Sequence, residues 1–303
     1  MRVLVTGASG FLGSRVCDAL LARGDEAVGL TRDPQRARGS KPAVSWHAWN
    51  ATAERPPAQA LEGADAVVNL IGEPIDQRWT DEAKRRIRES RERATKNLVD
   101  ALGAAEPRPA ALVSQSAVGY YGDRGEAVVD ESTPPGSSFD AGVCVAWEAA
   151  ARAAEELGAR VAVVRTGLVL DPEAGLLKQL LPPFRLGLGG PIAGGRQYMP
   201  WIHVDDWVRL VLWLVDGGER SGVYNGTAPN PVTNAALSKA LGRAVGRPAV
   251  VPVPKLAMKA RFGSELGEVL AGGQRAIPRR ALDEGFEFSH PELEPALRSL
   301  LGR

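Results

Sequence analysis

The chain has 303 residues, and its 37 Lys and Arg residues nearly balance its 36 Asp and Glu residues. This balance gives no global field that would attract nucleic acid or an anionic membrane surface, and no apolar stretch approaches the length of a membrane span. We therefore expect neither partner, and the length suits one α/β domain with a substrate-binding addition.

The first thirteen residues carry the most informative pattern. An aliphatic run at residues 2–6 predicts a buried strand, and a helix follows shortly after it. Three glycines lie between and within them at three-residue spacing: Gly7, Gly10 and Gly13. They allow a sharp turn, close approach of the backbone to a diphosphate, and close packing of the helix on the sheet. The first N–H groups of that helix, at Phe11 and Leu12, favour an anion. We predict a dinucleotide site; a glycine turn without a nucleotide is the alternative.

The second predicted strand, residues 26–31, ends next to a charged pair of residues, Arg32 and Asp33. In a dinucleotide-binding fold this position meets the adenosine ribose. A carboxylate there accepts from the 2′-OH of NAD, whereas an arginine pairs with the 2′-phosphate of NADP. Arg32, helped by Thr31, favours NADP(H). The alternative is a surface Arg32 whose neighbour Asp33 binds the ribose.

Strands and helices continue to alternate through the first half of the chain. This rhythm predicts a doubly wound parallel sheet with helices on both faces. The further strands are expected at residues 44–49, 66–71, 111–114 and 161–165, and the helices at residues 81–102 and 141–157.

The end of the strand at residues 66–71 is expected to line the cofactor. The backbone of Leu70 and Ile71 would lie along its adenine and ribose side, and Gly72 permits close approach. The Glu73 carboxylate is a candidate partner for a ribose hydroxyl or for the substrate, with a solvent-exposed loop carboxylate as the alternative.

The segment VSQSAVGYYG at residues 113–122 follows the fifth strand, where doubly wound enzymes hold catalytic groups. Ser116 is our candidate for orienting a substrate carbonyl. Ser114 is the alternative if the register of the strand differs by a residue or two. The structural alternative for Ser116 is a turn hydroxyl that forms a hydrogen bond with its own backbone. Tyr120 and Tyr121 are candidate acids or pocket walls, and we expect core packing for at least one of them.

After residue 165 the rhythm breaks. The Pro- and Gly-rich stretch 181–195 predicts a mobile or irregular segment suited to shaping a pocket. Short strands are expected at residues 201–204 and 223–225 with a helix at 206–215, and mostly helices from residue 234 to a last one at 291–301. We therefore predict a dinucleotide-binding domain at 1–170, to which 201–230 returns, and a substrate-binding cap made of 171–200 and 231–303.

Cysteine and histidine are too sparse to predict a disulfide framework or a metal site. Cys17 and Cys144 fall in predicted helices, which favours reduced core thiols and a cytoplasmic protein. Of the three histidines, His203 lies in the segment HVDD, but no spacing fits a zinc or iron site. We expect Asp205 to cap the following helix and His203 to be packed.

Taken together, these motifs resemble the extended or atypical short-chain dehydrogenase/reductases, and more closely the NAD(P)-binding "epimerase family" proteins with a C-terminal domain of unknown function. The resemblance implies a Rossmann core that binds NADP(H) through the glycines, Thr31 and Arg32, a pocket under the C-terminal helices, and a possible homodimer. The stretches that carry it include VTGASGFLG (5–13), SAVGYYG (116–122), LPPFRLGLGGPI (181–192), PWIHVDD (200–206) and GQRAIPRRALDEGFEF (273–288).

The sequence departs from the superfamily at the catalytic Tyr-x-x-x-Lys pair. No Tyr is followed by Lys at the fourth position, and Asp140 and Cys144 stand in the two places, before Trp147 and Glu148. Tyr120 or Tyr121 would then supply the proton from another position, or Glu148 would act as the acid/base with a pKa raised by burial. An ion-paired helical carboxylate is the alternative for Glu148.

Several arginines add candidates for anion binding. Arg165 ends the sixth strand and is expected to anchor the pocket or the phosphate side of the cofactor, with an internal salt bridge as the alternative. Arg78, Arg85 and Arg91 could bind an anionic substrate, although solvated helix residues explain them more simply.

Three functions remain open at this point. The leading one is an NADP(H)-dependent oxidoreductase acting on a small, unidentified carbonyl or hydroxyl compound. The second, motivated by the absent Tyr/Lys pair, is a cofactor-loaded sensor or scaffold without turnover. The third is a nucleotide-sugar epimerase or dehydratase.

Overall fold

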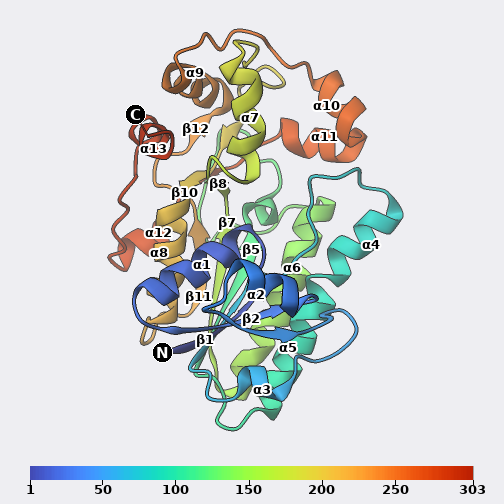
Figure 1. Ribbon diagram of the computed structural model, residues 1–303. Helices are drawn as coiled ribbons and strands as arrows, with labels where there is room; N and C mark the ends of the chain where they lie inside the picture. Colours follow the sequence, from blue (N-terminus) through green and yellow to red (C-terminus); the bar gives the residue numbers. More distant parts are fainter. Residues whose placement is uncertain (303) are drawn as a thin grey trace.

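A parallel seven-stranded sheet forms the centre of the computed structural model, which describes residues 1–302 (Figure 1). Its strand order is β11-β7-β5-β4-β1-β2-β3, as expected for a doubly wound sheet. The last residue of the predicted cap, residue 303, lies outside the described residues. The strands are β1 (Arg2–Thr6), β2 (Glu26–Thr31), β3 (Ser45–Ala48), β4 (Ala66–Asn69), β5 (Ala111–Ala117), β7 (Arg160–Thr166) and β11 (Gly222–Gly226).

Helices cover both faces of this sheet because its strands are apolar on both sides. In β1, Val3 and Val5 pack into one core cluster and Leu4 into the other, and all three are fully buried. One face carries α1 (Phe11–Ala22), α2 (Pro34–Ser40) and α8 (Val204–Val215), and the other carries α3 (Ala58–Leu61), α5 (Glu92–Ala104) and α6 (Phe139–Arg152).

A buried polar ladder fixes the carboxyl ends of the central strands. The Thr6 hydroxyl donates to Asn69 Oδ1 at 2.7 Å, and Asn69 Nδ2 donates to Thr95 Oγ1 at 3.0 Å and to Ser114 Oγ at 3.1 Å. These contacts join β1, β4, β5 and α5. Since every polar atom in the ladder has a partner, its burial is stabilising and sets the register of the edge where ligands bind in such sheets.

A smaller, mostly helical region lies above this edge in Figure 1. It has its own apolar cluster, which includes Leu177, Leu181 and Leu241. We retain the predicted division into a dinucleotide-binding domain and a cap as a proposal. The helices here are α7 (Gly175–Arg185), α9 (Asn234–Val245), α10 (Lys255–Phe262), α11 (Ser264–Ala271) and α13 (Leu293–Leu300), while α12 (Arg279–Asp283) packs beside β11.

Three short strand pairs among residues 1–302 lie outside the main sheet, and the last of them joins the two regions. β8 (Leu168–Leu170) pairs with β10 (Trp201–His203), β9 (Tyr198–Met199) with β12 (Val232–Thr233), and β6 (Val128–Val129) with β13 (Arg275–Ala276). The strand expected at 201–204 is therefore present as β10 but pairs outside the main sheet, whereas the one expected at 223–225 joins the sheet as β11.

Two helix predictions were wrong in extent. The helix expected at 81–102 is interrupted at Ser90 and Arg91, which separate α4 (Asp81–Glu89) from α5. Arg91 has φ −105° and ψ −61°, outside the centre of the helical region. The helix expected at 141–157 ends as α6 at Arg152 and continues as a 3₁₀ segment, Ala153–Leu157.

The stretch 181–195 is irregular only in its second part. Residues 181–185 continue α7 through Pro182 and Pro183, because Leu181 and Phe184 bury their side chains there. Packing has outweighed the hydrogen bonds that the two prolines remove. Within residues 1–302, no helix is long and apolar enough to cross a membrane.

Candidate functional site

The glycine turn between β1 and α1 has the backbone that the sequence predicted. Gly7 has φ +64°, a left-handed conformation, and a Cβ on it would lie 2.8 Å from the carbonyl oxygen of Leu70. The N–H of Gly10 donates to the oxygen of Gly7 at 2.8 Å. A Cβ on Gly13 would collide with that same oxygen. The turn is therefore too tight for any other residue at Gly7 or Gly13.

The first turn of α1 presents donors that nothing in the described chain uses. Gly10 caps the helix without a side-chain acceptor, and the N–H groups of Phe11, Leu12 and Gly13 have no acceptor within residues 1–302. Unsatisfied N–H groups and the helix dipole together attract an anion. A diphosphate fits this place, since it supplies the missing acceptors. We call residues 7–13 together with Arg32 the cradle.

At the end of β2 the structure separates the two candidates for the ribose. Asp33 is the N-cap of α2, and its Oδ1 accepts from the N–H of Arg36 at 3.0 Å. Thr31 Oγ1 accepts from the N–H of Asp33. The Arg32 side chain is exposed and makes no hydrogen bond or ion pair with any other described residue. One oxygen of the Asp33 carboxylate thus already caps α2, while the Arg32 guanidinium has no partner among the described residues and is available for a phosphate.

The loop after β4 lies beside the turn. The N–H of Leu70 donates to the Thr6 hydroxyl, which fixes the chain next to Gly7, and Ile71 and Gly72 follow at the surface. The Glu73 carboxylate accepts from Gln77 Nε2 at 3.3 Å and lies 3.6 Å from Arg86 Nε. Its predicted contact with a ribose or substrate stays a prediction.

Ser116, Glu148 and Arg165 form a buried set at the ends of β5 and β7. Glu148 is 7% exposed and Arg165 is 3% exposed. The Ser116 hydroxyl donates to Glu148 Oε1 at 2.7 Å, and Arg165 donates to both carboxylate oxygens, Nε at 2.8 Å and Nη2 at 2.9 Å. A bidentate pair of this kind is strong and geometrically specific.

Tyr121 completes this set, which we call the closed cluster: Ser116, Tyr121, Glu148 and Arg165. The Tyr121 hydroxyl donates to Asn225 Oδ1 at 2.7 Å and accepts from Arg165 Nη1 at 3.1 Å. Burial raises the pKa of Tyr121 to about 12. Ser116 and Tyr121 are both fully buried. Catalytic roles for Ser116, Tyr121 and Glu148 stay predictions that this closure disfavours.

Tyr120 differs from the other predicted catalytic residues. It is half-buried, and its hydroxyl has no hydrogen-bond partner anywhere in residues 1–302. The guanidinium carbon of Arg165 lies 3.3 Å from the centre of its ring, which holds the ring in place. Among the four candidates, Tyr120 therefore has the hydroxyl that can meet a ligand.

Two residues occupy the places of the superfamily's Tyr and Lys. Asp140 lies in the first turn of α6 against Gly119, and burial raises the pKa of its carboxyl. Cys144 lies one turn further, and burial raises the pKa of its thiol to about 12. A buried thiol of this kind carries no charge to replace the lysine. Both cysteines are buried and unpaired among the described residues, as the sequence predicted.

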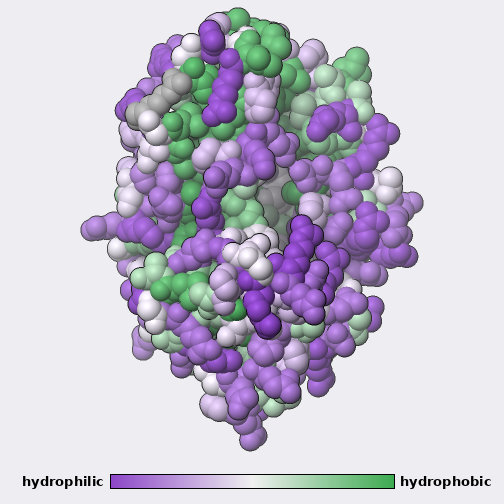
Figure 2. All heavy atoms as spheres, in the orientation of Figure 1, coloured by the Kyte–Doolittle hydropathy of each residue, from purple (hydrophilic) through white to green (hydrophobic). Residues whose placement is uncertain are grey.

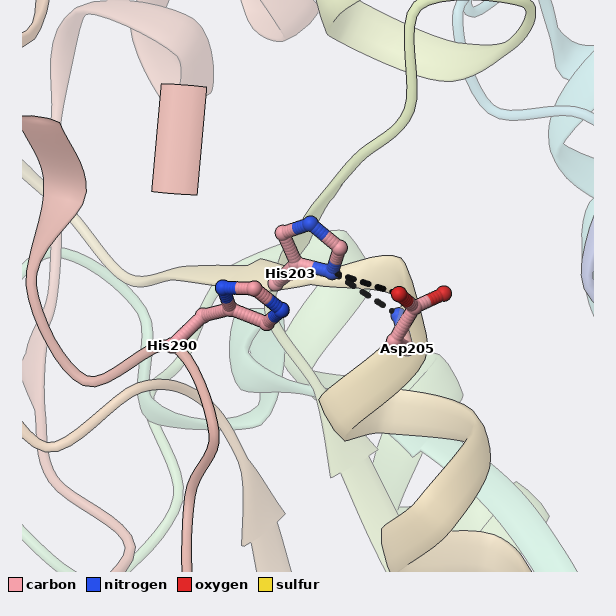
Figure 3. Close-up of side chains that lie close together, drawn as sticks. All are labelled: His203, Asp205 and His290. Carbon is pink, nitrogen blue, oxygen red and sulfur yellow. Dashed lines mark hydrogen bonds and ion pairs between the residues drawn. The ribbon is translucent and has the colours of Figure 1, made fainter. Parts of the chain in front are cut away.

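The cap of α8 was predicted wrongly. His203, not Asp205, is the N-cap, and its Nδ1 accepts from the N–H of Asp205 at 3.0 Å (Figure 3). The ring of His203 stacks on that of His290 with centres 3.8 Å apart. Although these side chains lie close enough together to suggest a metal site, the Nδ1 lone pair is already used and stacked rings point their nitrogens poorly at one ion.

Sequence reasoning missed two residues, Asn225 and Glu131, that support the closed cluster through hydrogen bonds. Asn225 accepts from Tyr121 and donates to the carbonyl of Ile277 at 2.9 Å, and its own N–H donates to Glu131 Oε1 at 2.9 Å. Burial raises the pKa of the Glu131 carboxyl. A polar residue inside the predicted strand 223–225 was the available signal for Asn225. The sequence held no signal for Glu131.

Figure 2 shows a recess on one face, between the upper helices and the sheet domain, at the level of the strand ends in Figure 1. The cradle, Tyr120 and the loop after β4 all follow carboxyl ends of strands in the sheet. The geometry thus places an anion site for a diphosphate and a phenol hydroxyl at one edge, which is where open α/β sheets bind ligands.

Comparison with known families and proteins shows the family of this chain. Residues 3–225 match the model of the NAD dependent epimerase/dehydratase family, and residues 253–300 match a domain of unknown function, DUF1731. The chain is 41% identical over 303 residues to an Arabidopsis thaliana protein named "Epimerase family protein SDR39U1 homolog, chloroplastic", covering 99% of this chain and 87% of that one. It is 37% identical to Homo sapiens SDR39U1, covering 99% and 100%.

Solved structures show the same fold. The crystal structure of human SDR39U1 (isoform 2) with NADPH has a TM-score of 0.90 and 36% identity, covering all of both chains. A nucleoside-diphosphate sugar epimerase from Corynebacterium glutamicum has a TM-score of 0.80 and 30% identity, covering all of this chain and 58% of that one.

Proposed function

The chain belongs to the NAD dependent epimerase/dehydratase family, and we propose that it is an NADP(H)-dependent oxidoreductase of the atypical short-chain type. Its substrate would be a small carbonyl or hydroxyl compound. The observation that carries the proposal is the different use of the two charged residues after β2. Asp33 caps a helix, and the exposed Arg32 side chain is available for a phosphate.

The cradle fits NADP(H) in two places. The N–H groups of Phe11, Leu12 and Gly13 would hold the diphosphate, and Arg32 with Thr31 would hold the 2′-phosphate. The backbone at Leu70, Ile71 and Gly72 would line the adenosine side. The human relative crystallised with NADPH supports the same cofactor for this chain. When bound, NADPH supplies a hydride for a carbonyl carbon.

Tyr120 is our candidate proton donor. Its hydroxyl is unpartnered within the described chain, and Arg165 fixes its ring from one side. A positioned donor of this kind contributes roughly 10²–10⁴-fold to a proton transfer. Glu148 would be a positioning residue, since it holds the Arg165 guanidinium through two hydrogen bonds.

Adjacent tyrosines give a matched test. Purified protein and its Tyr120→Phe and Tyr121→Phe variants are assayed for NADPH oxidation with a broad panel of aldehydes, ketones and quinones. We expect the wild type to reduce at least one compound, Tyr120→Phe to lose about 100-fold or more of kcat, and Tyr121→Phe to keep most of it. Equal NADPH affinity in all three proteins is the control. Full activity in Tyr120→Phe would show that another group donates the proton.

A sensor or scaffold without turnover is the second candidate. It is favoured by Asp140 and Cys144 in place of the Tyr/Lys pair and by the burial of the closed cluster. Tight NADPH binding together with no turnover of any panel compound would select it. Under this function, substitution of Arg32 or Gly10 would abolish binding of a partner protein instead of a rate.

A nucleotide-sugar epimerase remains the third candidate, supported by the name of the Corynebacterium structure. It needs a reversible acid/base pair, and exchange of substrate hydrogen in labelled water would reveal one. Apart from the choice among these functions, we propose the cytoplasmic location and the homodimer that the sequence predicted. The name of the Arabidopsis relative, which includes "chloroplastic", makes the location worth testing by fractionation.

A further inference from the structure

Arg91 lies at the break between α4 and α5, and it is not the solvated helix residue that the sequence favoured. Its side chain is half-buried, whereas Arg78 and Arg85 are exposed. The guanidinium carbon lies 5.1 Å from the centre of the Trp147 ring. A Cβ on Gly72 would lie 3.0 Å from the same carbon. Arg91 is thus held between the loop after β4 and α6.

The hydrogen bonds of Arg91 use one edge of the guanidinium. Nη1 donates to the carbonyl of Glu73 at 3.0 Å and to that of Ile87 at 3.2 Å, with the Ser90 hydroxyl at 3.5 Å. Nε and Nη2 have no acceptor in residues 1–302, and neither is sealed from solvent. These two nitrogens form the side of the fork that binds a carboxylate or phosphate at two points.

The buried Arg165 is an arginine of this protein whose guanidinium nitrogens all have hydrogen-bond acceptors. Its Nε and Nη2 bind both oxygens of Glu148, and its Nη1 binds Tyr121. Arg91 has the corresponding Nη1 contacts and lacks the carboxylate. Among the described residues, no Asp or Glu forms an ion pair with it.

The surroundings of Arg91 hold more donors than acceptors. The indole N–H of Trp147 is buried and also lacks an acceptor within the described chain. The Glu73 carboxylate, in the loop next to Arg91, is engaged by Gln77 and Arg86. Burial lowers the pKa of the Arg91 guanidinium, because few groups here compensate its positive charge. An anion bound at Nε and Nη2 would supply that compensation.

Arg91 also lies next to elements that form the proposed site. Trp147, whose ring Arg91 faces, directly precedes Glu148 of the closed cluster on α6. Gly72 and Glu73 belong to the loop that we assign to the cofactor. The guanidinium therefore lies between the loop assigned to the cofactor and the helix that carries Glu148 of the closed cluster.

We propose that the Nε–Nη2 edge of Arg91 binds an anionic group of the substrate, so that the substrate class is a carbonyl or hydroxyl compound bearing a carboxylate or a phosphate. This inference rests on the proposed function for the carbonyl or hydroxyl part. The anion site stands on the geometry of Arg91. The backbone contacts of Nη1 hold the fork in place, so little side-chain freedom is lost when the anion binds.

Calorimetric titration with simple anions tests the site without knowledge of the substrate. Oxalate, inorganic phosphate and the neutral isostere oxamide are titrated into the wild type, both empty and saturated with NADP+. We expect oxalate or phosphate to bind and oxamide to show no binding. Preference for oxalate assigns a carboxylate substrate, and preference for phosphate assigns a phosphate ester.

Variants place the anion on Arg91. We expect Arg91→Met to weaken anion binding roughly 10- to 100-fold, as expected for a lost charge-assisted contact. Arg91→Lys keeps the charge and loses the two-point contact, so it should fall between Arg91→Met and the wild type. Arg93→Met is the matched control, because Arg93 is an exposed residue of α5 two positions after Arg91. Its affinity should change less than about twofold, since exposed charges act weakly.

Three results would overturn the proposal. The first is an absence of anion binding to both forms of the wild type. The second is an unchanged anion affinity in Arg91→Met or, if that variant does not fold, in Arg91→Lys, which keeps the charge and loses the two-point contact. The third is a loss of NADP+ affinity equal to that of anion affinity, which would assign Arg91 to the cofactor's diphosphate. Failure of NADP+ to bind the wild type would instead contradict the proposed function, and the empty protein would still test Arg91.

Discussion

The closed cluster and the cradle lie at the same edge of the sheet and use their polar groups in opposite ways. In the closed cluster, Glu148 accepts three hydrogen bonds from Ser116 and Arg165. In the cradle, the first N–H groups of α1 and the Arg32 guanidinium have no acceptor within residues 1–302. Satisfied buried groups stabilise a fold, whereas aligned unsatisfied donors at the surface bind ligands. The difference separates the residues that support the site from those that contact its ligand.

Removal of the Glu148 carboxylate from the closed cluster is expected to have the largest effect on stability. Glu148→Ala leaves the Arg165 guanidinium buried without its carboxylate, which costs about 3–5 kcal/mol of the free energy of unfolding. The variant should still bind NADPH as the wild type does at a temperature where it is folded. Urea unfolding and fluorescence titration measure the two quantities.

Glu82→Ala is the control for this variant. Glu82 is exposed and pairs with Arg85 and Arg86 on α4. Its loss should cost less than about 1 kcal/mol, because water screens such pairs. A similar cost for both variants would mean that the closed cluster is not the stabilising element we describe.

The pH dependence of the stability of the wild type and of Tyr121→Phe tests the burial of the Tyr121 hydroxyl. Burial raises the pKa of Tyr121 to about 12, above the value near 10 of an unfolded chain. Its neutral phenol therefore adds stability that is complete below about pH 10 and is lost as the pH rises towards 12, roughly 2–3 kcal/mol in total. The wild type should lose that much more than Tyr121→Phe between pH 9 and 12. Parallel curves would place the Tyr121 hydroxyl in contact with water.

His203 shares features of both the closed cluster and the cradle. Its Nδ1 accepts a hydrogen bond, whereas its buried Nε2 has no partner within the described chain. His203→Ala should cost about 0.5–2 kcal/mol through loss of the α8 cap. Burial, with the nearby His290, lowers the pKa of His203. The neutral ring's contribution is thus present above about pH 6.5 and shrinks as the pH falls. Thermal unfolding at pH 8 and pH 5 should show that narrowing difference between the variant and the wild type.

The cradle could be predicted from the sequence because its parts are local. Gly7, Gly10 and Gly13 follow one strand at fixed spacing, and Arg32 follows the next. Alternation of strands and helices then gave the order of the sheet, with the glycine turn at its carboxyl edge. Such features depend on neighbours along the chain, where period and turn chemistry carry information.

The closed cluster could not be predicted in the same way. The pairing of Glu148 with Arg165 depends on how α6 packs against β7, and the contact of Tyr121 with Asn225 joins residues 104 positions apart. At the break between α4 and α5, Arg91 donates to the carbonyl of Glu73, 18 positions away along the chain, a contact that no periodicity in residues 81–102 reveals. These are tertiary effects, and they decide which candidate hydroxyl stays available.

The affinities of NADPH and NADH for the wild type and for Arg32→Ala test the account most directly, with Arg38→Ala as an exposed control on α2. We predict that the wild type prefers NADPH and that Arg32→Ala weakens NADPH about 10- to 100-fold, as expected for a lost charge-assisted pair. NADH affinity should stay within about twofold, because exposed charges that lack a partner contribute little. Preference of the wild type for NADH, or an equal loss for both nucleotides, would contradict the assignment of Arg32 to the 2′-phosphate.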